Sequence, residues 1–339
     1  MYVGLDPHQC ELRDATAHAL GELCPPAALR DAWADPHGLS RRRWRRLAEL
    51  GLTSVTLPTE LGGLGGTEVD LVPLLEEVGY VALPEPVADA AVAASLLAEV
   101  APQSADVVLA GLADGSTVLT LGVPSHPYVD HATAADAVVL ATSDAVHLIE
   151  PGVSSWEEHV SVDGGRRLAR WVGPLPPPRA TDAGPAIDRA IQRATLASAA
   201  MLVGLGRRSV DLGVAYARER HQFGRPIGSY QALRHRLADD WTALEFARPL
   251  VWRAAWSLAH DAPDAHLHVS MAKAAAGDAA GGAARTAVQV HGAMGYTFEC
   301  DVQLYLKRTL ALASAHGDAR HHRRRVAAVL AERDIEALP

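Results

Sequence analysis

The stretch YARERHQFGRPIGSYQALRHRLAD, residues 216–239, decides the fold of the second half of this chain. It contains the end of one helical pattern near Arg218, the break GRPIGS, and the start of a second helical pattern at Tyr230. The first helix is predicted from about Ile187, and the second to about His260. Two long helices joined by so short a break are typical of neighbouring helices in a bundle.

The same alternation of long helix and short loop continues toward the C-terminus. Further helices are predicted over about 266–292, 301–313 and 319–333. The apolar residues, 49% of the chain, are mostly Ala, Leu and Val, while aromatic residues make up only 5%, and Ala and Leu are strong helix formers. The sequence therefore predicts a C-terminal bundle of four or five helices over residues 184–339.

Upstream of the bundle the pattern changes twice. The segments STVLTLGV, DAVVLATS and AVHLIE, which lie between residues 104 and 183, are short, rich in Val, Leu and Thr, and bounded by turn residues. Residues 1–103 instead have helical spacing, with Ser40 as a predicted N-cap and Trp44 on a buried face. The predicted fold class is an α+β multidomain protein with an N-terminal α domain (1–103), a small β domain (104–183) and the bundle (184–339).

Composition and charge exclude several classes of function. The formal net charge of −9 disfavours a dedicated nucleic-acid-binding protein. Three scattered cysteines (Cys10, Cys24, Cys300) form neither a disulfide framework nor a Cys-x-x-Cys site, which suits a reducing compartment. The N-terminal stretch is acidic where a signal peptide is basic, and the apolar runs are too short or too rich in Gly and Ala to span a bilayer. We expect a soluble cytoplasmic protein.

Two familiar site patterns are incomplete. None of the histidines forms the His-Glu-x-x-His arrangement that places metal ligands on one helix face, so no metal site is predicted. Gly204 and Gly206 resemble the start of a dinucleotide fingerprint, but the third glycine is missing and a helix, not a strand, precedes them. Close packing of helices is the favoured interpretation of these glycines.

Polar residues gather where two of the predicted helices end. Arg220 and Gln222 precede Gly224, and Gln289 precedes Gly292. An arginine beside a helix break suits a phosphate group, and glycine allows a ligand to approach the backbone. The residues alone therefore predict an anion site at these helix ends.

These stretches closely resemble the acyl-CoA dehydrogenase family. The family's first motif is Arg-x-Gln-Phe-Gly, followed downstream by Gln and then by Leu-Ala-Asp. In this chain the first motif corresponds to Arg220, Gln222, Phe223 and Gly224, and the downstream glutamine to Gln231. The Leu-Ala-Asp group corresponds to residues 237–239.

A second signature of the family, Gln-x-x-Gly-Gly-x-Gly-[Tyr/Phe]-Thr, is also present. It corresponds here to Gln289, Gly292, Ala293 and Gly295 followed by Tyr-Thr, so that Ala293 stands in place of the second glycine. Residues 44–65 are similar to the family's N-terminal Trp…Pro-Glu…Gly-Gly segment. The resemblance covers most of the chain in the right order, and the α–β–α organisation is the family's architecture.

The resemblance implies flavin chemistry on a thioester. Enzymes of this family use FAD to desaturate an acyl-CoA between Cα and Cβ: a carboxylate removes the α-proton while the β-hydrogen leaves as hydride to the flavin. It also implies an acceptor similar to electron-transfer flavoprotein.

The family's catalytic carboxylate is missing at both positions where it is expected. The usual Glu precedes Gly-Thr near the C-terminus, where this chain has His316 and then Asp318 in place of the Thr. A minority of the family places the Glu on the first helix of the bundle, where this chain has Ala194.

The β domain is also reduced. The family's Thr-Glu-Pro…Gly-Ser-Asp stretch, which covers the flavin ring, has no counterpart between Val118 and Val139. The Trp-containing strand is missing as well, because Trp156 and Trp171 lie too late in the sequence to replace it.

The retained and the lost motifs belong to different halves of a shared site. In the family's tetramers each FAD lies in one subunit, and the neighbouring subunit holds the pyrophosphate and adenosine through the two motifs kept here. The chain therefore resembles the degenerate subunit of bacterial steroid-degrading α2β2 acyl-CoA dehydrogenases, a heterotetramer with a related partner chain. The implied FAD contacts are Arg220, Gln222, Phe223, Gln231, Gln289, Gly292 and Ala293.

Two other functions remain open at this point. The chain could be a stand-alone flavoenzyme of secondary metabolism, a homo-oligomer in which His316 serves as the base because imidazole titrates near neutral pH. It could also be a scaffold subunit that binds no flavin. The acyl group is not disclosed by the sequence, although the Ala- and Gly-rich helices are compatible with a bulky substrate such as a steroid or polyketide.

Overall fold

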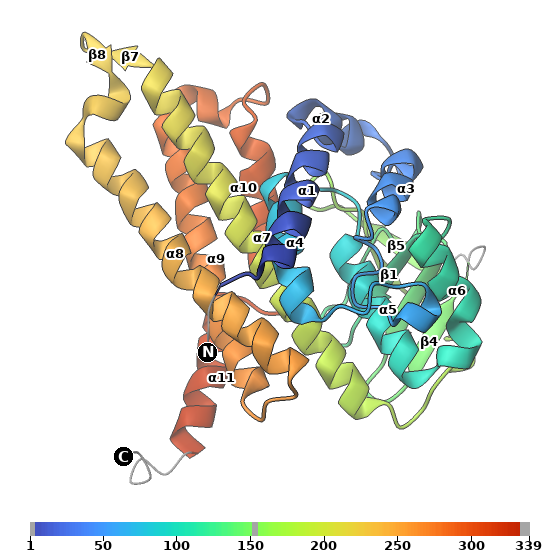
Figure 1. Ribbon diagram of the computed structural model, residues 1–339. Coiled ribbons are helices and arrows are strands. Elements are labelled where there is room, and N and C mark those ends of the chain that lie inside the picture. The colour runs from blue at the N-terminus through green and yellow to red at the C-terminus, as the bar shows by residue number, and fades with distance from the viewer. Residues whose placement is uncertain (1–3, 151–154, 333–339) are drawn as a thin grey trace. The chain divides into compact units, whose positions relative to one another are not determined.

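A computed structural model describes residues 4–150 and 155–332, and it has the predicted order of helices, small sheets and helical bundle (Figure 1). The N-terminal helices are α1 (Pro7–Leu23), α2 (Pro26–Ala34), α3 (Arg41–Glu49), η1 (Thr59–Leu61), α4 (Glu68–Tyr80), α5 (Val87–Val100) and α6 (Pro102–Asp114). The strands that follow are β1 (Leu119–Gly122), β2 (Val129–Asp130), β3 (Ala137–Ala141), β4 (Val146–Ile149), β5 (Trp156–His159) and β6 (Leu168–Trp171).

The C-terminal elements begin with α7 (Gly184–Glu219), a helix of 36 residues. The remaining ones are β7 (His221–Gln222), β8 (Arg225–Pro226), η2 (Ile227–Ser229), α8 (Gln231–Ala259), α9 (Ala265–His291), η3 (Gly292–Tyr296), α10 (Val302–Ser314) and α11 (Ala319–Glu332).

The chain forms two compact units. One, here called the mixed unit, comprises residues 7–74 and 83–194; the other, here called the bundle unit, comprises residues 75–82 and the chain from 195 onward, with a short N-terminal piece. Helices α4 and α7 each contribute residues to both units. In the described part of the chain, no helix combines the length and the apolar character needed to cross a membrane.

In the mixed unit, the predicted N-cap and buried tryptophan are confirmed. The Ser40 side chain accepts a hydrogen bond from the Arg43 backbone N–H at 3.2 Å and so begins α3. Trp44, on the buried face of α3, is fully buried, and its indole N–H donates to the Thr117 carbonyl at 2.9 Å. This bond fastens α3 to the segment that leads into the first strand.

The mixed unit contains two small sheets. Strand β3 pairs in parallel with β1 and antiparallel with β4, while β6 lies between β2 and β5 in an antiparallel sheet. Strand β2 and helices α2 and α6 were not foreseen from the sequence. Helix α6 begins at Pro102, a favoured first helical residue, and it extends the helical part of the chain past the predicted limit at residue 103.

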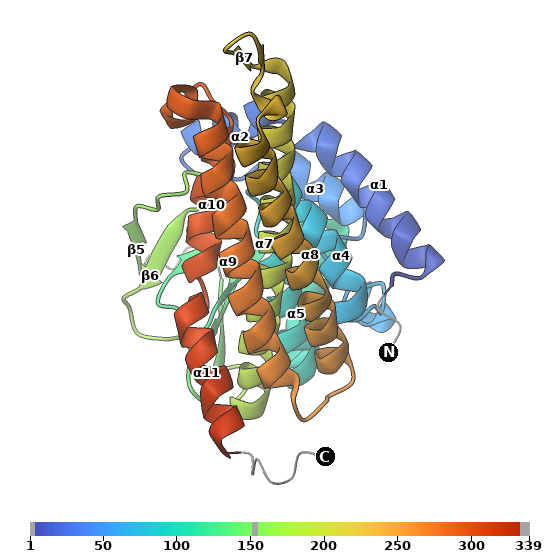
Figure 2. The ribbon, with the colours of Figure 1, turned by 90° about the vertical axis from the view of Figure 1, so that its left-hand side faces the viewer.

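The bundle unit is built around α9, which packs against α8, α10 and α11 (Figure 2). Many of the buried positions of α9 are alanine, and they include Ala276, Ala280 and Ala284. Small residues let neighbouring helix backbones approach closely. The expected break between α7 and α8 is a short hairpin of β7 and β8 followed by η2.

Helices α4 and α7 cross within the bundle unit with their backbones in contact. A Cβ added at Gly204 would lie 1.8 Å from the Glu76 carbonyl oxygen, and one added at Gly79 would lie 2.1 Å from the Met201 carbonyl oxygen. Both distances are far inside van der Waals contact, so only glycine fits at either position. The prediction that Gly204 serves close helix packing is confirmed.

A buried ionic network lies beside this crossing. The fully buried Glu76 carboxylate accepts hydrogen bonds from Arg248 Nε and from Trp252 Nε1, each at 2.8 Å. Arg207 Nη1 donates to Glu77 Oε1 at 3.0 Å. Burial raises the pKa of Glu76, and the charge of Arg248 opposes that rise. The network ties the end of α4 to both α7 and α8.

The crossing predicts a large difference between two glycine substitutions. Gly204→Ala should lower the free energy of unfolding by about 3 kcal/mol or more, because the helices must separate to admit a methyl group. Gly277→Ala in α9 is the control, since nothing lies within 4 Å of its added Cβ, and it should raise stability by about 0.5–1 kcal/mol. Urea unfolding measures both, and equal effects of the two substitutions would contradict the close crossing.

Candidate functional site

The predicted FAD contacts lie at one end of the bundle unit. Arg220 follows α7, Gln222 lies in β7, and Gln231 begins α8. Gln289 lies in the last turn of α9, and Gly292 and Ala293 begin η3. The helix ends are joined by a ring stack, because the rings of Tyr216 and His291 lie 4.2 Å apart.

Packing beneath these residues holds the three helix ends together. Ala217 of α7, Leu237 of α8 and Val290 of α9 form one buried cluster, against which Ile227 of η2 packs. The predicted contacts therefore lie at or beside the ends of helices that are fixed by their neighbours. The two sequence motifs are brought to the same end of the bundle by this cluster and by the ring stack.

The hairpin after α7 has a tight two-residue turn. Gln222 pairs with Arg225, and the residues between them, Phe223 and Gly224, have φ of 53° and 81°. Positive φ at both central residues is typical of the turn that matches strand twist in a two-residue hairpin. The Tyr230 hydroxyl donates to the Gln222 carbonyl at 3.2 Å, and the Arg225 guanidinium lies 4.2 Å from the centre of the Tyr230 ring.

Phe223, at the tip of this turn, is 91% exposed. A bulky residue in the left-handed region is strained, and an exposed phenyl ring gains nothing from burial to offset that strain. Tyr296 and Phe298, which follow the second motif, are also exposed, by 80% and 73%. An apolar surface of this kind at one end of a bundle is typical of an interaction site.

The second motif leaves backbone open to a ligand. Gly292 has φ of 58°, its N–H caps α9 by donating to the Gln289 carbonyl, and nothing lies within 4 Å of a Cβ added there. Gln289 and Ala293 are both exposed beside it. A ligand can therefore approach the backbone at Gly292 while the Gln289 side chain stays available to it.

His316, the predicted base, lies apart from these residues. It sits in the turn between α10 and α11, whereas the FAD contacts lie at the start of η3 before α10, and a helix of this length spans roughly 20 Å. His316 and Gly317 have φ of 55° and 98°. The nearby Asp318 carboxylate accepts the His321 backbone N–H at 2.7 Å and so begins α11. The role of His316 as a base stays a prediction.

Two buried basic groups hold this turn, and neither was predicted from the sequence. The Lys273 amine donates to the Leu312 carbonyl at 2.6 Å and to the Ala313 carbonyl at 3.2 Å, at the end of α10. His322 Nε2 donates to the His316 carbonyl at 3.0 Å. Burial lowers the pKa of Lys273 to about 7 and that of His322 to about 4. The sequence feature that could have indicated a buried Lys273 is its position inside an alanine-rich helical segment.

In the mixed unit, polar residues between Val118 and Val139, the stretch in which the resemblance predicts no flavin-covering segment, are engaged with their own chain. Asp130 accepts hydrogen bonds from Arg166 Nε at 2.7 Å and from the Arg167 backbone N–H at 3.0 Å. The fully buried His131 has its Nδ1 3.2 Å from the His37 carbonyl oxygen and its Nε2 2.9 Å from the Pro84 carbonyl oxygen. These polar groups face inward.

Burial raises the pKa of Asp89, in the first turn of α5, to about 7, and the negative charge of Asp130 adds to the rise. The positive charge of Arg166 acts in the opposite direction. A carboxyl with this pKa is partly neutral at pH 7, which reduces the negative charge held near Asp130.

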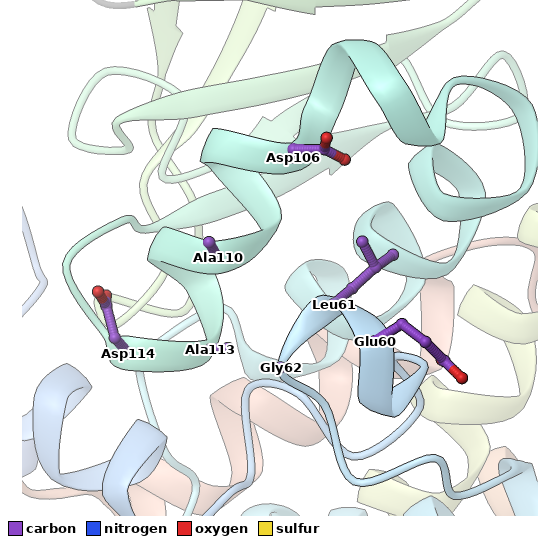
Figure 3. Close-up of a pocket in the computed structure, with 7 residues that line it drawn as sticks. All are labelled: Glu60, Leu61, Gly62, Asp106, Ala110, Ala113 and Asp114. Carbon is purple, nitrogen blue, oxygen red and sulfur yellow. The ribbon is translucent and has the colours of Figure 1, made fainter.

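A pocket of about 630 Å³ between η1 and α6 is acidic and holds none of the predicted site residues (Figure 3). The carboxylates of Glu60, Asp106 and Asp114 line it, together with Leu61 and small residues. It offers no basic group for an anionic cofactor. Among residues 4–150 and 155–332, no group of three or more His, Cys, Asp and Glu side chains is placed to hold a metal ion.

Comparison with known families gives matches in both helical parts of the chain. Residues 6–115 match the family described as acyl-CoA dehydrogenase, N-terminal domain, and residues 185–331 match acyl-CoA dehydrogenase, C-terminal domain. Acyl-CoA dehydrogenase IpdE2 of Mycobacterium tuberculosis is 36% identical over 309 residues, which are 91% of this chain and 91% of that protein. IpdE2 of Mycolicibacterium smegmatis is 32% identical over 94% of this chain and 97% of that protein.

Solved structures show the same fold. One chain of the ChsE4–ChsE5 complex from Mycobacterium tuberculosis superposes with a TM-score of 0.88 at 24% identity, covering 98% of this chain and 100% of that one. A variant of the Tcur3481–Tcur3483 steroid ACAD gives a TM-score of 0.87 at 24% identity, covering 96% and 98%.

The buried Lys273 predicts a particular dependence of stability on pH. Its pKa is about 7 in the folded chain and 10.5 for an ordinary lysine, so between these values the unfolded chain binds one more proton. Stability contributed at this site is therefore lost as the pH falls toward 7 and gained as it rises toward 10.5, by about 1.4 kcal/mol per pH unit.

Lys273→Met removes this titration. The difference in free energy of unfolding between the parent chain and the variant should grow in favour of the parent from pH 7 to pH 9, as measured by urea unfolding at each pH. Two curves that stay parallel over this range would contradict the lowered pKa of Lys273.

Proposed function

The chain belongs to the acyl-CoA dehydrogenase family of oxidoreductases acting on CH–CH bonds, and we propose that it supplies one half of a shared FAD site to a related partner chain. The enzyme so formed desaturates an acyl-CoA thioester between Cα and Cβ. The observation that carries the proposal is Phe223, whose ring is 91% exposed and held at a positive φ. Such a residue has a physical reason to be there when a second surface covers it.

The residues at the exposed end of the bundle suit the pyrophosphate and adenosine parts of FAD. Arg220 would neutralise the pyrophosphate, because a guanidinium matches phosphate oxygens in charge and geometry. Gln222, Phe223 and Gln231 would line the adenosine. The open backbone at Gly292 admits a ligand close to the chain, which supports this fit.

Gln289, Gly292 and Ala293 would present a side chain amide and backbone groups to the same cofactor. When bound, FAD supplies the acceptor for the hydride. The residues of this chain would bind and orient the cofactor, and none of them would transfer a proton.

The mixed unit gives a reason for assigning the flavin ring to the partner. Asp130 and His131, in the stretch where the family covers the ring, bond to Arg166 and to backbone carbonyls of their own chain. Their hydrogen-bonding groups are thus engaged within the chain and do not face a flavin ring. This supports a division in which the partner chain houses the ring and provides the catalytic carboxylate.

The names of the relatives point to a partner and a substrate class. One solved structure is a complex of two chains, ChsE4 and ChsE5, and another is named a steroid ACAD. By analogy we infer a heterotetramer with a related acyl-CoA dehydrogenase chain, a steroid-derived acyl-CoA as substrate and an acceptor similar to electron-transfer flavoprotein.

Purification of the chain alone, and co-expressed with a related chain that retains the catalytic Glu, tests the proposal. We expect a colourless chain alone and a yellow complex with about one FAD per pair of chains, read from flavin absorbance and mass. A lone chain that carries one FAD per subunit would overturn the shared site and favour the stand-alone enzyme. A colourless complex would favour the scaffold.

Arg220→Met should cause the complex to lose its flavin, because the positive charge that neutralises the pyrophosphate is removed. We expect a fall in bound flavin of about tenfold or more, since a charged hydrogen bond is worth about 1.5–3 kcal/mol. Arg324→Met is the control, because Arg324 is an exposed arginine on α11 of the same unit. Flavin absorbance per mole of complex measures both. Equal retention of flavin by the two variants would show that Arg220 does not hold the cofactor.

His316→Asn tests where the proton is removed. Asparagine tolerates the positive φ at this position better than most residues, so the turn is preserved. With the base in the partner chain, the variant complex should keep its kcat within about twofold. A loss of two or more orders of magnitude, with the flavin retained, would instead identify His316 as the base.

A further inference from the structure

Two ring side chains, Tyr216 and His291, are each attached to one of the two segments that carry the proposed FAD contacts. Tyr216, on α7, lies one helical turn before Arg220, and its carbonyl accepts the Arg220 backbone N–H at 2.9 Å. His291 ends α9 and lies between Gln289 and Gly292. Both ribbon views place the β7–β8 hairpin and the segment after α9 at the same end of the bundle unit (Figures 1 and 2).

The two rings are stacked on one another. Their centres lie 4.2 Å apart, their planes are inclined by 25°, and both side chains are half-buried. The His291 Nδ1–H donates to the Ala287 carbonyl at 2.8 Å, one turn back on α9, and this bond fixes the orientation of the imidazole. Stacked rings attract one another beyond the apolar area that they bury. The stack therefore links the end of α7 to the end of α9 in one orientation.

The turn after α9 is packed against the same residue. A Cβ added at Gly295 of η3 would lie 2.6 Å from the Val288 carbonyl oxygen and 3.2 Å from the His291 Cβ. Because η3 lies this close to the last turn of α9, a displacement of His291 also displaces the backbone of η3. The position of the imidazole thus bears directly on the backbone at Gly292 and Ala293.

The stack is a directional contact between the two segments. Within residues 4–150 and 155–332, no hydrogen bond or ion pair connects residues 216–231 with residues 289–296. The buried cluster of Ala217, Leu237 and Val290 also holds the helices together, but apolar packing of this kind is non-directional. The relative orientation of the two segments therefore depends on the two rings.

We propose that Tyr216 and His291 are positioning residues of the FAD half-site, which act through Arg220 and the backbone at Gly292. This inference rests on the shared FAD site proposed above. A cofactor that is held at two points binds more tightly when the two protein groups are already at the right spacing, because less freedom is lost on binding. The stack keeps that spacing in the chain before the cofactor binds.

Titration of FAD into the flavin-free complex of this chain with its partner chain tests the pair. Tyr216→Leu and His291→Leu should each raise the Kd for FAD about three- to tenfold, as expected for the loss of one ring stack. Tyr216→Phe keeps a ring that can stack, and its Kd should stay within about twofold of the parent value. The variant with both leucines should bind no more weakly than the weaker single variant, because each ring acts through the other.

A second stack in the same unit provides the matched control. The rings of Trp256 and His260 lie 4.3 Å apart with planes inclined by 19°. Trp256 is near the opposite end of α8 from Gln231, a separation of roughly 38 Å along the helix. Trp256→Leu should lower the Tm about as much as Tyr216→Leu, but it should leave the Kd for FAD unchanged.

The amount of FAD bound at saturation separates weakened positioning from a lost site. At saturating FAD, the Tyr216→Leu complex should still hold about one FAD per pair of chains, with the absorption spectrum of the parent. A complex that stays below this amount at saturation would count against a positioning role.

Three further outcomes would overturn the inference while the parent complex binds FAD. They are an unchanged Kd for Tyr216→Leu, a Tyr216→Phe variant as weak as Tyr216→Leu, and a double variant whose loss is the product of the two single losses. Each of them leaves the shared FAD site standing. A parent complex that binds no FAD would instead overturn the shared site, and this inference with it.

Discussion

At the crossing of α4 and α7, two helix backbones touch with no side chain between them, and the rest of the bundle unit depends on this contact. It brings Glu76, fully buried, to Arg248 and Trp252 of α8 and within 3.8 Å of the Arg207 guanidinium of α7, so that a single carboxylate contacts groups on two other helices. Removing one partner of a buried ion pair leaves a charge uncompensated, which makes such a network intolerant of change. Helix α7 continues from the crossing to Glu219, and its end sets the position of Arg220 and of the hairpin.

The polar groups of the mixed unit are bonded within their own chain, whereas those at the exposed end of the bundle unit are open to solvent. In the mixed unit, Asp130 and His131 bond to their own chain. At the exposed end of the bundle, Gln222, Gln289 and the backbone at Gly292 are turned toward solvent. A chain that housed the flavin ring would leave the polar groups at Asp130 and His131 open to the ring. The division fits the proposed enzyme, in which each chain carries the part that its own packing leaves open.

Much of the fold could be predicted from the sequence, because helical spacing and caps are local signals. The Ser40 cap, the buried Trp44 and the limits of α7, α8, α9 and α10 are confirmed to within a few residues. Helices α2 and α6 were missed, since they are short or of mixed polarity and lie near prolines. The strand β2, of two residues, is fixed by its pairing with β6 and has no local signal.

The candidate site was also predicted only in part from the sequence. The FAD contacts were found through two motifs whose spacing is a property of the chain itself. Lys273 and His322 were not found, because their roles depend on the carbonyls of Leu312, Ala313 and His316, which only the folded chain brings near them. The close contact at Gly79 could not be predicted from the sequence either, because the residue that faces it, Met201, lies more than a hundred positions away. Long-range partners of this kind are set by tertiary packing and leave no periodic pattern.

The exposed aromatic end of the bundle has a consequence for the chain's life in the cell. Phe223, Tyr296 and Phe298 stay in water until another surface covers them. A copy made without its partner therefore presents the kind of apolar surface that chaperones retain and proteases remove. In the proposed assembly, the amount of this chain is limited by the amount of its partner, and balanced synthesis of the two becomes a condition for either to accumulate.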